Sequence, residues 1–402
     1  MAASWLWGQP TLLCSSPSKG KYVGAGLDRA NDLPFGGCLK ITFFGLTLSS
    51  SWGNGHATPY RAVLQALHRR GIDLVFYEKD VPYYAKHRDF SSCEYCDLEL
   101  YSDWNSVQAQ ALRDAGESDI VVVGSYTPEG ARIGDDLLKL AKPLHVFYDL
   151  DTPVTLNRLN QGPLDYLRRE QIPEFDLYLS FTGGGLICRL EQQYGARIAR
   201  PLYGCVDPDE YHRVPSRDDF ACALSYVGTY APDRQAKLDE LFLEPARQRT
   251  DLRFVLAGSL YPFEWTWPGN VARFEHVAPS DHSALYSSSL ATLNVTRQEM
   301  AASGYCPSGR FFEAAACGTP ILTDYWEGLE SFFDVQCELH VVHTPDDVLA
   351  LLNAPPGQLQ QAAERARNRT LEEHTGEVRA KEFLAHCEEA YRHKNLAAGV
   401  RA

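Results

Sequence analysis

Arg310 and Glu313 are the two residues whose types and spacing most clearly suggest chemistry in this sequence. In an α-helix, side chains three positions apart lie near one face, so a guanidinium for phosphate would stand beside a carboxylate for sugar hydroxyls. A solvated ion pair on an ordinary helix is the plain alternative. The glycines nearby and the loop after the helix favour a binding site, and the loop residues expected in it are Trp326, Glu327 and Gly328.

The helix that must carry this pair is short and has clear boundaries. Pro307 and Ser308 are start signals, with Ser308 suited to the N-cap, and Gly318 is a stop signal. We therefore expect a helix over about residues 308–317. Its first N–H groups lack partners within the helix, so they and the helix dipole would attract an anion at Ser308 and Gly309.

Two further cationic positions stand where strands are expected to end. Gly228, Thr229 and Arg234 belong to a loop between a strand and a helix, so its amides and guanidinium could approach a diphosphate. A surface turn with an exposed arginine is the alternative. Arg297 follows another strand, and its fork of donors suits phosphate, although a structural pair with a carboxylate would explain it as well.

A glycine-rich turn in the first half of the chain positions a histidine. Gly53, Asn54 and Gly55 follow an expected strand and place His56 near the start of a helix. Because an imidazole titrates close to neutral pH, His56 could accept a proton or contact a sugar. A lone histidine at a helix start is also commonly a hydrogen-bonded structural residue.

Two carboxylates follow a later strand. Alternation would point Asp149 and Asp151 toward one face of the strand end, where either could act as a catalytic base. The alternative is an Asx-turn before Pro153, with both carboxylates capping backbone amides. Thr182 and Gly183 lie in another glycine-rich loop, which we expect to line a cleft and not to catalyse.

Composition excludes several classes of protein. The chain has 402 residues, of which 45% are hydrophobic and 22% charged, enough for two domains that each bury a core. The formal charge of −14 disfavours a nucleic-acid partner. With no long apolar run and no secretory signal pattern, we expect a cytoplasmic protein that does not span a membrane. Eleven scattered cysteines fit reduced thiols, and the Cys93–Cys96 spacing is assigned to packing in preference to zinc or redox chemistry.

Apolar strands alternate with helical stretches from Leu39 onward, and this rhythm is typical of α/β domains with parallel sheets. The rhythm restarts near residue 210, which predicts two doubly wound domains with a ligand cleft at the carboxyl ends of their strands. The expected boundaries are an N-terminal extension over 1–38, a first domain over 39–208, a second domain over 209–375 and a C-terminal helix over 376–402.

Several of these stretches together resemble GT-B glycosyltransferases, most closely the spore-maturation CgeB-type branch. The segments that carry the resemblance span about residues 40–345 and are Ile41–Leu48, Ser51–Arg61, Val146–Pro153, Tyr203–Pro208, Tyr226–Arg234, Leu293–Arg297 and Ser303–Leu329.

The resemblance implies a fold and a set of roles. It implies two facing Rossmann-like domains, with the donor bound by the second, the acceptor by the first, and the last helix, 378–394, returning to the first domain. Glu313 corresponds to the carboxylate expected to bind the nucleotide ribose, and His276 to the region that holds the base. For Asp281, in the same segment, a helix N-cap is the alternative. Helix dipole and basic residues would replace a divalent metal, so no metal or further cofactor is expected.

One position departs from the pattern of the family. Many retaining members carry two glutamates that are separated by seven residues. In this chain the residue eight positions before Glu313 is Tyr305 and not a glutamate. This departure leaves the sugar contacts and the stereochemical outcome of a transfer open.

The expected function is transfer of a sugar from a nucleotide-diphosphate sugar to an acceptor that the sequence does not identify. The alternatives are a sugar-nucleotide epimerase on the same fold and a catalytically silent protein of the spore surface or its assembly. The nucleotide base, the sugar and the oligomeric state stay open, because a fold hosts many functions.

Overall fold

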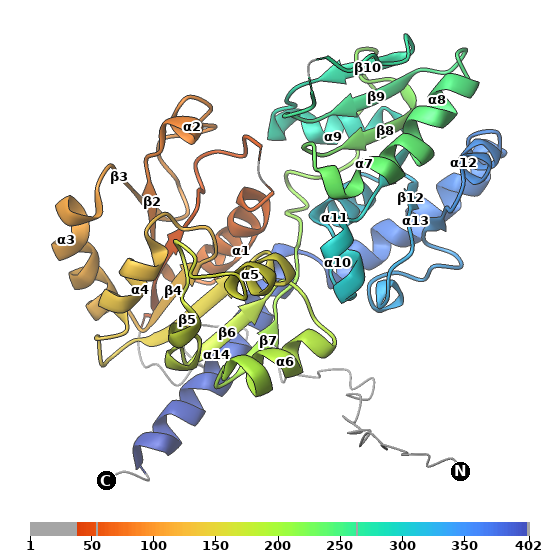
Figure 1. Cartoon of the computed structure of the whole chain (residues 1–402). Coiled ribbons are helices and arrows are strands. Elements are labelled where there is room, and N and C mark those ends of the chain that lie inside the picture. Colours follow the sequence, from red (N-terminus) through yellow and green to blue (C-terminus); the bar gives the residue numbers. More distant parts are fainter. Residues whose placement is uncertain (1–37, 54, 263, 400–402) are drawn as a thin grey trace, which may run out of the picture.

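The computed structural model describes residues 38–53, 55–262 and 264–399, which form two α/β domains side by side (Figure 1). The extension expected over residues 1–38 lies, apart from its last residue, outside the described residues. Each domain is built on one sheet whose strands all run parallel, and helices cover both faces. The expectation of two doubly wound domains is confirmed.

The first domain contains a seven-stranded sheet in the order β3-β2-β1-β4-β5-β6-β7. Its central strands are buried along their whole length, as expected for runs such as Ile120–Gly124 that are covered on both faces. The strands are β1 (Lys40–Gly45), β2 (Asp73–Lys79), β3 (Asp97–Tyr101), β4 (Ile120–Gly124), β5 (Leu144–Asp149), β6 (Leu177–Ser180) and β7 (Ala199–Pro201).

The helices of the first domain lie on the two faces of this sheet, and each face has its own hydrophobic core. Sequential parallel strands require such crossover connections. The helices are α1 (Ala57–Arg69), α2 (Pro82–Ala85), α3 (Trp104–Glu117), α4 (Gly130–Leu137), α5 (Thr152–Leu159), the 3-10 helix η2 (Arg169–Glu174) and α6 (Gly185–Tyr194).

The second domain contains a six-stranded sheet in the order β10-β9-β8-β11-β12-β13. Its strands are β8 (Cys222–Val227), β9 (Phe254–Ala257), β10 (Val271–Phe274), β11 (Ser289–Asn294), β12 (Ile321–Thr323) and β13 (His340–Val341). The segments between and after them form α7 (Pro232–Leu238), the π-helical turn η3 (Asp239–Leu243), α8 (Glu244–Gln248), α9 (Pro279–Ser287), α10 (Gln298–Ser303), α11 (Gly309–Ala316), the 3-10 helix η4 (Leu329–Ser331), α12 (Pro345–Leu352) and α13 (Pro356–Glu373).

The chain passes between the domains twice, and the two crossings are bonded to each other. The N–H of Val206, on the first crossing, donates to the backbone oxygen of His374 on the second at 3.1 Å. Arg379, which is 2% exposed, donates to the backbone oxygens of Tyr203 and Gly204. These contacts tie the two crossings to each other.

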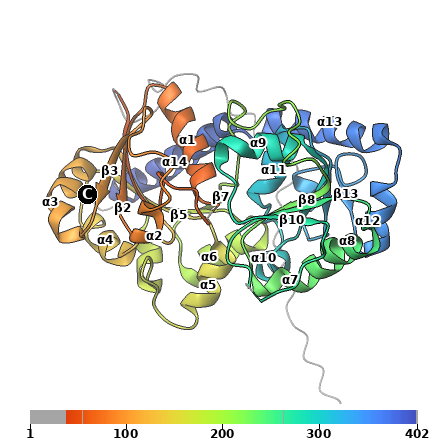
Figure 2. The ribbon, with the colours of Figure 1, turned by 90° about the horizontal axis from the view of Figure 1, so that it is seen from above.

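The last helix, α14 (Gly376–Gly399), packs on the first domain, where it lies against α1 (Figure 2). Its residue Phe383 stacks on Phe43 of β1 with ring centroids 6.1 Å apart. A Cβ atom on Gly376 would lie 2.3 Å from the backbone oxygen of Ala62, so this approach of α14 to α1 needs a glycine.

Local signals located most strands and missed several elements. Among the elements not expected were β3, α3, α5, α6 and α10. β3 is an edge strand in which polar and apolar residues alternate, and α5 and α10 are short. The described cysteines are all free thiols, Cys93 and Cys96 included. None of the helices in the described residues combines the length and the apolar character needed to cross a membrane.

Candidate functional site

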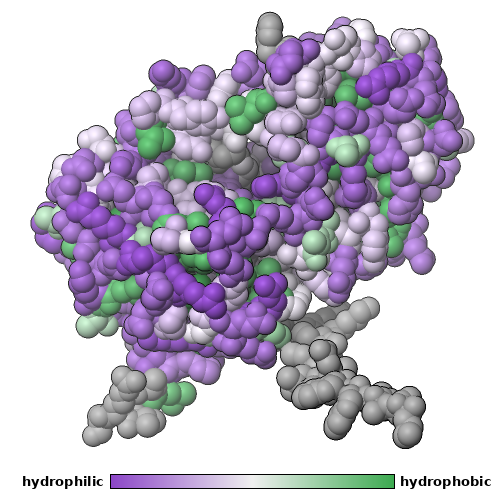
Figure 3. Space-filling model, in the orientation of Figure 1, coloured by the Kyte–Doolittle hydropathy of each residue, from purple (hydrophilic) through white to green (hydrophobic). Residues whose placement is uncertain are grey.

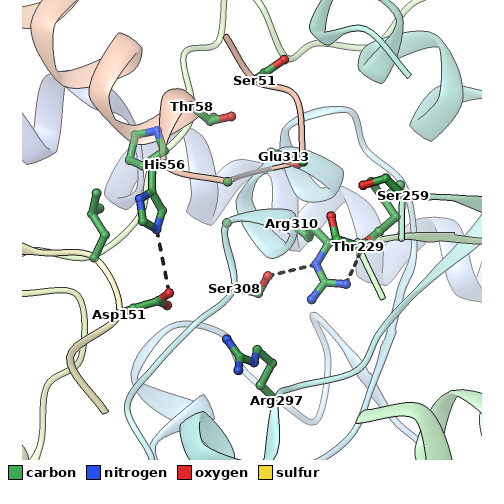
Figure 4. Close-up of a pocket in the computed structure, with 18 of the residues that line it drawn as sticks. Ser51, His56, Thr58, Asp151, Thr229, Ser259, Arg297, Ser308, Arg310 and Glu313 are labelled. Carbon is green, nitrogen blue, oxygen red and sulfur yellow. Dashed lines mark hydrogen bonds and ion pairs between the residues drawn. The ribbon is translucent and has the colours of Figure 1, made fainter. Parts of the chain in front are cut away.

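A cavity of about 490 Å³ lies between the domains, at the carboxyl ends of strands from both sheets. In the space-filling view it is seen as a recess between the two lobes (Figure 3). Loops after β1, β4 and β5 form one wall, and loops after β8, β9, β10 and β11 together with the start of α11 form the other (Figure 4). A volume of this size is within the usual range for small-molecule sites.

Helix α11 begins at the cavity and ends at Gly318, as its boundary signals predict. Gly318 has a φ of 70°, the left-handed conformation typical of a residue that terminates a helix. Ser308 stands at the N-cap but makes no side-chain cap hydrogen bond, and its Oγ accepts from Arg310 Nε at 3.0 Å instead. The first N–H groups of α11, at Gly309 and Arg310, therefore lack an intrahelical partner beside the cavity.

Arg310 lines the cavity and is fixed by the ends of two strands. Its Nη1 donates to the backbone oxygen of Val227 at 2.7 Å, and its Nη2 lies 3.4 Å from that of Val295. The guanidinium also lies over the ring of Tyr226, 5.4 Å from the centroid. Its hydrogen-bond partners are neutral oxygens, and its positive charge, which Glu313 partly offsets, suits it to an anionic ligand.

Arg234 is the second cation of the cavity wall and is 8% exposed. Its Nη2 donates to the backbone oxygen of Thr229, while its buried Nε has no hydrogen-bond partner within the described residues. Burial, together with repulsion from Arg310 and Arg297, lowers the pKa of the Arg234 guanidinium from its ordinary value. A buried cation among other cations is stabilised by an anion, so this arrangement indicates an anion site.

Arg297 is the third cation of the cavity wall, and it also forms the ion pair with a carboxylate that was the structural alternative. It lines the cavity, and its Nε also lies 3.3 Å from Asp233 Oδ2 at the start of α7. The ion pair holds the side chain in place. The loop residues Gly228 and Thr229 line the same wall, as expected.

Glu313 lies one turn into α11 and faces the same cavity, with 8% of the residue exposed. Its Oε2 accepts a hydrogen bond from the hydroxyl of Tyr286 at 3.2 Å. Burial raises the pKa of Glu313 to about 7, although the Tyr286 hydrogen bond and the charge of Arg310 act in the opposite direction. The carboxyl therefore titrates near neutral pH and can exchange hydrogen bonds with hydroxyl groups of a ligand.

Asp151 and His56 meet on the opposite wall, which the first domain contributes (Figure 4). The Nε2 of His56 lies 3.9 Å from Asp151 Oδ2, and the hydroxyl of Tyr126 donates to the same oxygen at 3.2 Å. Tyr126 has a φ of 63°, a conformation that is costly for a residue with a side chain and is often found at functional sites. The group can accept a proton from a ligand hydroxyl in the cavity.

Asp149 does not line the cavity, so the expectation that both aspartates point toward it is wrong for this residue. Its side chain is fully buried, where Oδ2 accepts from Tyr178 at 2.6 Å and Oδ1 accepts from Thr155 and from the N–H of Asp151. Alternation fails because β5 ends at Asp149 and the backbone turns before Asp151. Asp149 thus forms the Asx-turn that was the alternative, and burial raises its pKa to about 6.

Five other residues expected in the site lie behind its wall. Trp326 is buried against Phe311 and Phe332, because its ring belongs to the core of the second domain. The remaining four contact Tyr305 or Cys306: Glu327, Gly328 and Gly183 lie against Tyr305, and Thr182 donates to the sulfur of Cys306.

His276 also lines the cavity and packs against Trp52 of the first domain, with ring centroids 4.4 Å apart. Burial lowers the pKa of His276, so the ring is neutral at pH 7. Gly53 and Gly55 line the cavity nearby. Asn54, also expected in this turn, lies outside the described residues.

Gly258 and Ser259 line the cavity and were not expected in it. A Cβ atom on Gly258 would lie 2.0 Å from the backbone oxygen of Gly228, so the two loops can approach only if this residue is a glycine. The sequence did contain a signal for them. Both residues directly follow an apolar strand, as Gly228 does, and a loop in that position is expected to face the cleft. Other lining residues that sequence reasoning missed include Ser51, Thr58, Tyr84, Tyr126, Phe181, Glu275, Met300 and Cys306.

Positive charge in this cavity comes from side chains and from the start of α11. Throughout the described residues, no cluster of three or more His, Cys, Asp or Glu side chains is arranged to hold a metal ion.

Comparison with known proteins identifies the fold. Residues 234–385, less than half of the chain, match the family model described as glycosyl transferase-like. Sucrose-phosphate synthase from Thermosynechococcus elongatus superposes with a TM-score of 0.61 and 13% identity over 89% of this chain and 100% of that one. The chain has the GT-B fold. No curated protein sequence matches it.

Two other solved GT-B structures carry nucleotide ligands. An alpha-glucosyltransferase in complex with UDP-glucose and DNA containing an abasic site gives a TM-score of 0.64 at 12% identity, over 87% of this chain and 100% of that one. HepE of Anabaena in complex with UDP-glucose gives 0.60 at 12% identity, over 86% and 98%. At such identities the likeness establishes the fold, and function must be argued from the site.

Proposed function

We propose that the protein is a glycosyltransferase that binds a nucleotide-diphosphate sugar against its second domain and an acceptor hydroxyl against its first. One observation carries the proposal: Arg234, Arg297 and Arg310 converge with the start of α11 on a single cavity between the domains. The match of residues 234–385 to a glycosyl transferase-like family supports it. We also propose that the protein belongs to the CgeB-type branch of these enzymes.

The second domain would hold the donor by its charged and polar parts. The arginines and the first N–H groups of α11 bind the diphosphate, and they stabilise the negative charge that develops on it as it departs. Glu313 accepts hydrogen bonds from the ribose hydroxyls. His276, which lines the same cavity, would lie beside the base.

The first domain would supply the group that accepts the proton. A hydroxyl of the acceptor attacks the anomeric carbon, the bond from that carbon to the diphosphate breaks, and the hydroxyl proton passes to the Asp151 carboxylate beside His56. Tyr126 fixes the orientation of that carboxylate. The net charge of −14 disfavours nucleic acid as the acceptor.

We further propose that transfer needs no divalent metal, because arginines and a helix start already neutralise the diphosphate. Activity should then be unchanged in EDTA. A requirement for added Mg²⁺ or Mn²⁺ would contradict this part of the proposal.

Glu313→Ala should weaken UDP binding on the order of tenfold or more, because a buried carboxylate that accepts hydrogen bonds from hydroxyl groups is lost. UDP is the first probe, since solved structures of the same fold contain it. The measurement is titration calorimetry in EDTA with UDP, GDP and TDP on wild type and variant. If a folded Glu313→Ala protein bound UDP with wild-type affinity, Glu313 would not belong to the donor site. If wild type bound none of the nucleotides, the alternative of a catalytically silent protein would be favoured.

Product analysis with UDP-glucose and no acceptor distinguishes the proposed glycosyltransferase from the remaining alternative, a sugar-nucleotide epimerase. A glycosyltransferase without acceptor releases glucose slowly by hydrolysis or leaves the donor intact. A rearranged sugar or sugar nucleotide would favour the epimerase.

The raised pKa of Glu313 predicts that donor binding depends on pH. The ionised carboxylate is the form that accepts ribose hydrogen bonds, so affinity for UDP-glucose should rise from about pH 6 and level off above about pH 8. Glu313→Gln should remove this dependence. UDP-glucose is the suitable ligand because its diphosphate has no terminal phosphate that titrates in this range.

The raised pKa of Glu313 also determines the direction in which the stability of the protein changes with pH. The folded protein holds the Glu313 proton more tightly than the unfolded chain does, so this group's contribution to the free energy of unfolding falls as pH rises from about 4.5 through about 7. Glu313→Gln should therefore be more stable than wild type at about pH 8, as chemical denaturation would measure.

A further inference from the structure

Tyr305 has a backbone conformation that residues with side chains rarely adopt. Its φ is 47°, in the left-handed region, and it follows Gly304, whose φ is 65°. Such a conformation persists only where surrounding contacts impose it. Tyr305 does not belong to the lining of the cavity, so direct ligand contact does not explain it.

The ring of Tyr305 is wedged between glycines from the two domains. A Cβ atom on Gly184, in the first domain, would lie 2.4 Å from Cδ2 of the ring, and a Cβ atom on Gly328, in the second, would lie 2.5 Å from Cδ1. Both glycines have positive φ, 60° and 87°. Only residues without side chains leave room for the ring at these places.

Hydrogen bonds hold the backbone of the same residue from both domains. The N–H of Tyr305 donates to the backbone oxygen of Glu327 at 2.7 Å, and its own backbone oxygen accepts from the N–H of Gly183 at 3.0 Å. The hydroxyl of Thr182 donates to the sulfur of Cys306, the next residue, at 3.0 Å. Residues that were expected to touch a ligand thus hold Tyr305 and its neighbour.

The residues directly after Tyr305 form part of the wall on the donor side. Cys306, Pro307 and Ser308 line the cavity, and Gly309 begins α11. The path of the backbone through Tyr305 therefore sets the position and direction of the helix start that carries Arg310 and Glu313.

We propose that Tyr305 is a positioning residue for the donor site: its wedged ring fixes residues 306–309, and with them the start of α11, against the first domain. The role in donor binding rests on the proposed function, whereas the fixing of the loop does not. Because the wedge includes Gly184, the geometry of the donor side depends on how the first domain docks. A change at Tyr305 should act on nucleotide affinity through α11 without removing any ligand contact.

Three substitutions distinguish the role of the Tyr305 ring from the role of its backbone conformation. Tyr305→Phe keeps the ring, Tyr305→Ala removes it, and Tyr305→Gly removes it while making the positive φ easy to adopt. Tyr325→Ala is the matched control, because Tyr325 is a nearby tyrosine of the same domain that is 49% exposed. Hydrogen exchange of the amides in residues 306–312 is measured on the ligand-free proteins, and UDP affinity is measured by calorimetry.

Exchange in residues 306–312 should be faster in Tyr305→Ala and Tyr305→Gly, and unchanged in Tyr305→Phe and Tyr325→Ala. UDP affinity should fall on the order of tenfold in the first two, since a small displacement of aligned groups has a large effect. Wild-type exchange in both ring-less variants would overturn the inference, as would faster exchange spread evenly over both domains. If wild type binds no nucleotide, the proposed function fails while the exchange data still decide the role of Tyr305.

Discussion

Replacing Arg234 with methionine should weaken UDP binding on the order of a hundredfold, because the diphosphate would lose charge-assisted hydrogen bonds from a buried donor. Arg234 is 8% exposed, and its Nε has no partner in the described part of the chain. Methionine keeps much of the side-chain volume and removes a buried cation from a group of cations. Stability should therefore be unchanged or slightly higher than in wild type. Titration calorimetry and chemical denaturation measure the two effects.

Uridine, which has no phosphate, is the ligand control for this experiment. Its affinity should be nearly the same for wild type and Arg234→Met, so that the loss is confined to the diphosphate. Arg217→Met is the matched protein control, since Arg217 forms ion pairs with Asp219 and Asp281 on the surface of the same domain and does not line the cavity. Equal losses for uridine and UDP would show that Arg234 shapes the pocket and does not bind phosphate.

Replacing Asp151 with asparagine should lower the turnover of UDP-glucose at least about a hundredfold, because the carboxylate that accepts the hydroxyl proton becomes a neutral amide of the same shape. UDP affinity should change little, since Asp151 lies on the opposite wall from the arginines. The measurement is UDP release with a panel of hydroxyl acceptors and, as a baseline, with water alone.

Variants of Tyr126 and His56 test whether these two residues act together with Asp151. Tyr126→Phe removes the hydroxyl that orients Oδ2, and His56→Ala removes the imidazole 3.9 Å away. Both should lower turnover by less than Asp151→Asn and leave UDP affinity unchanged. Wild-type turnover in Asp151→Asn would contradict the assignment, and wild-type turnover in His56→Ala would return that histidine to a structural role at the start of α1.

Much of the fold can be predicted from local patterns in the sequence. Buried strands such as Ile120–Gly124 are predictable because a strand covered on both faces must be apolar throughout. Helix α11 is predictable because Ser308 and Gly318 mark its ends, and a glycine readily adopts the left-handed conformation that terminates a helix. The edge strand β3 was missed because its polar and apolar residues alternate and most of them are partly exposed, so it contains no continuous apolar run.

The sequence by itself determined that two α/β domains form and that Arg310 and Glu313 share one face of a short helix, since these depend on periodicity and on residues close in the chain. Only the tertiary structure decided which loops line the cavity. It buried Asp149 and turned Asp151 toward the cavity, although they are two residues apart, because the chain turns where β5 ends. It also placed Gly184 of the first domain against Tyr305 of the second, a contact between residues that lie far apart in the chain. Such contacts depend on how the two domains pack, and no local pattern encodes that packing.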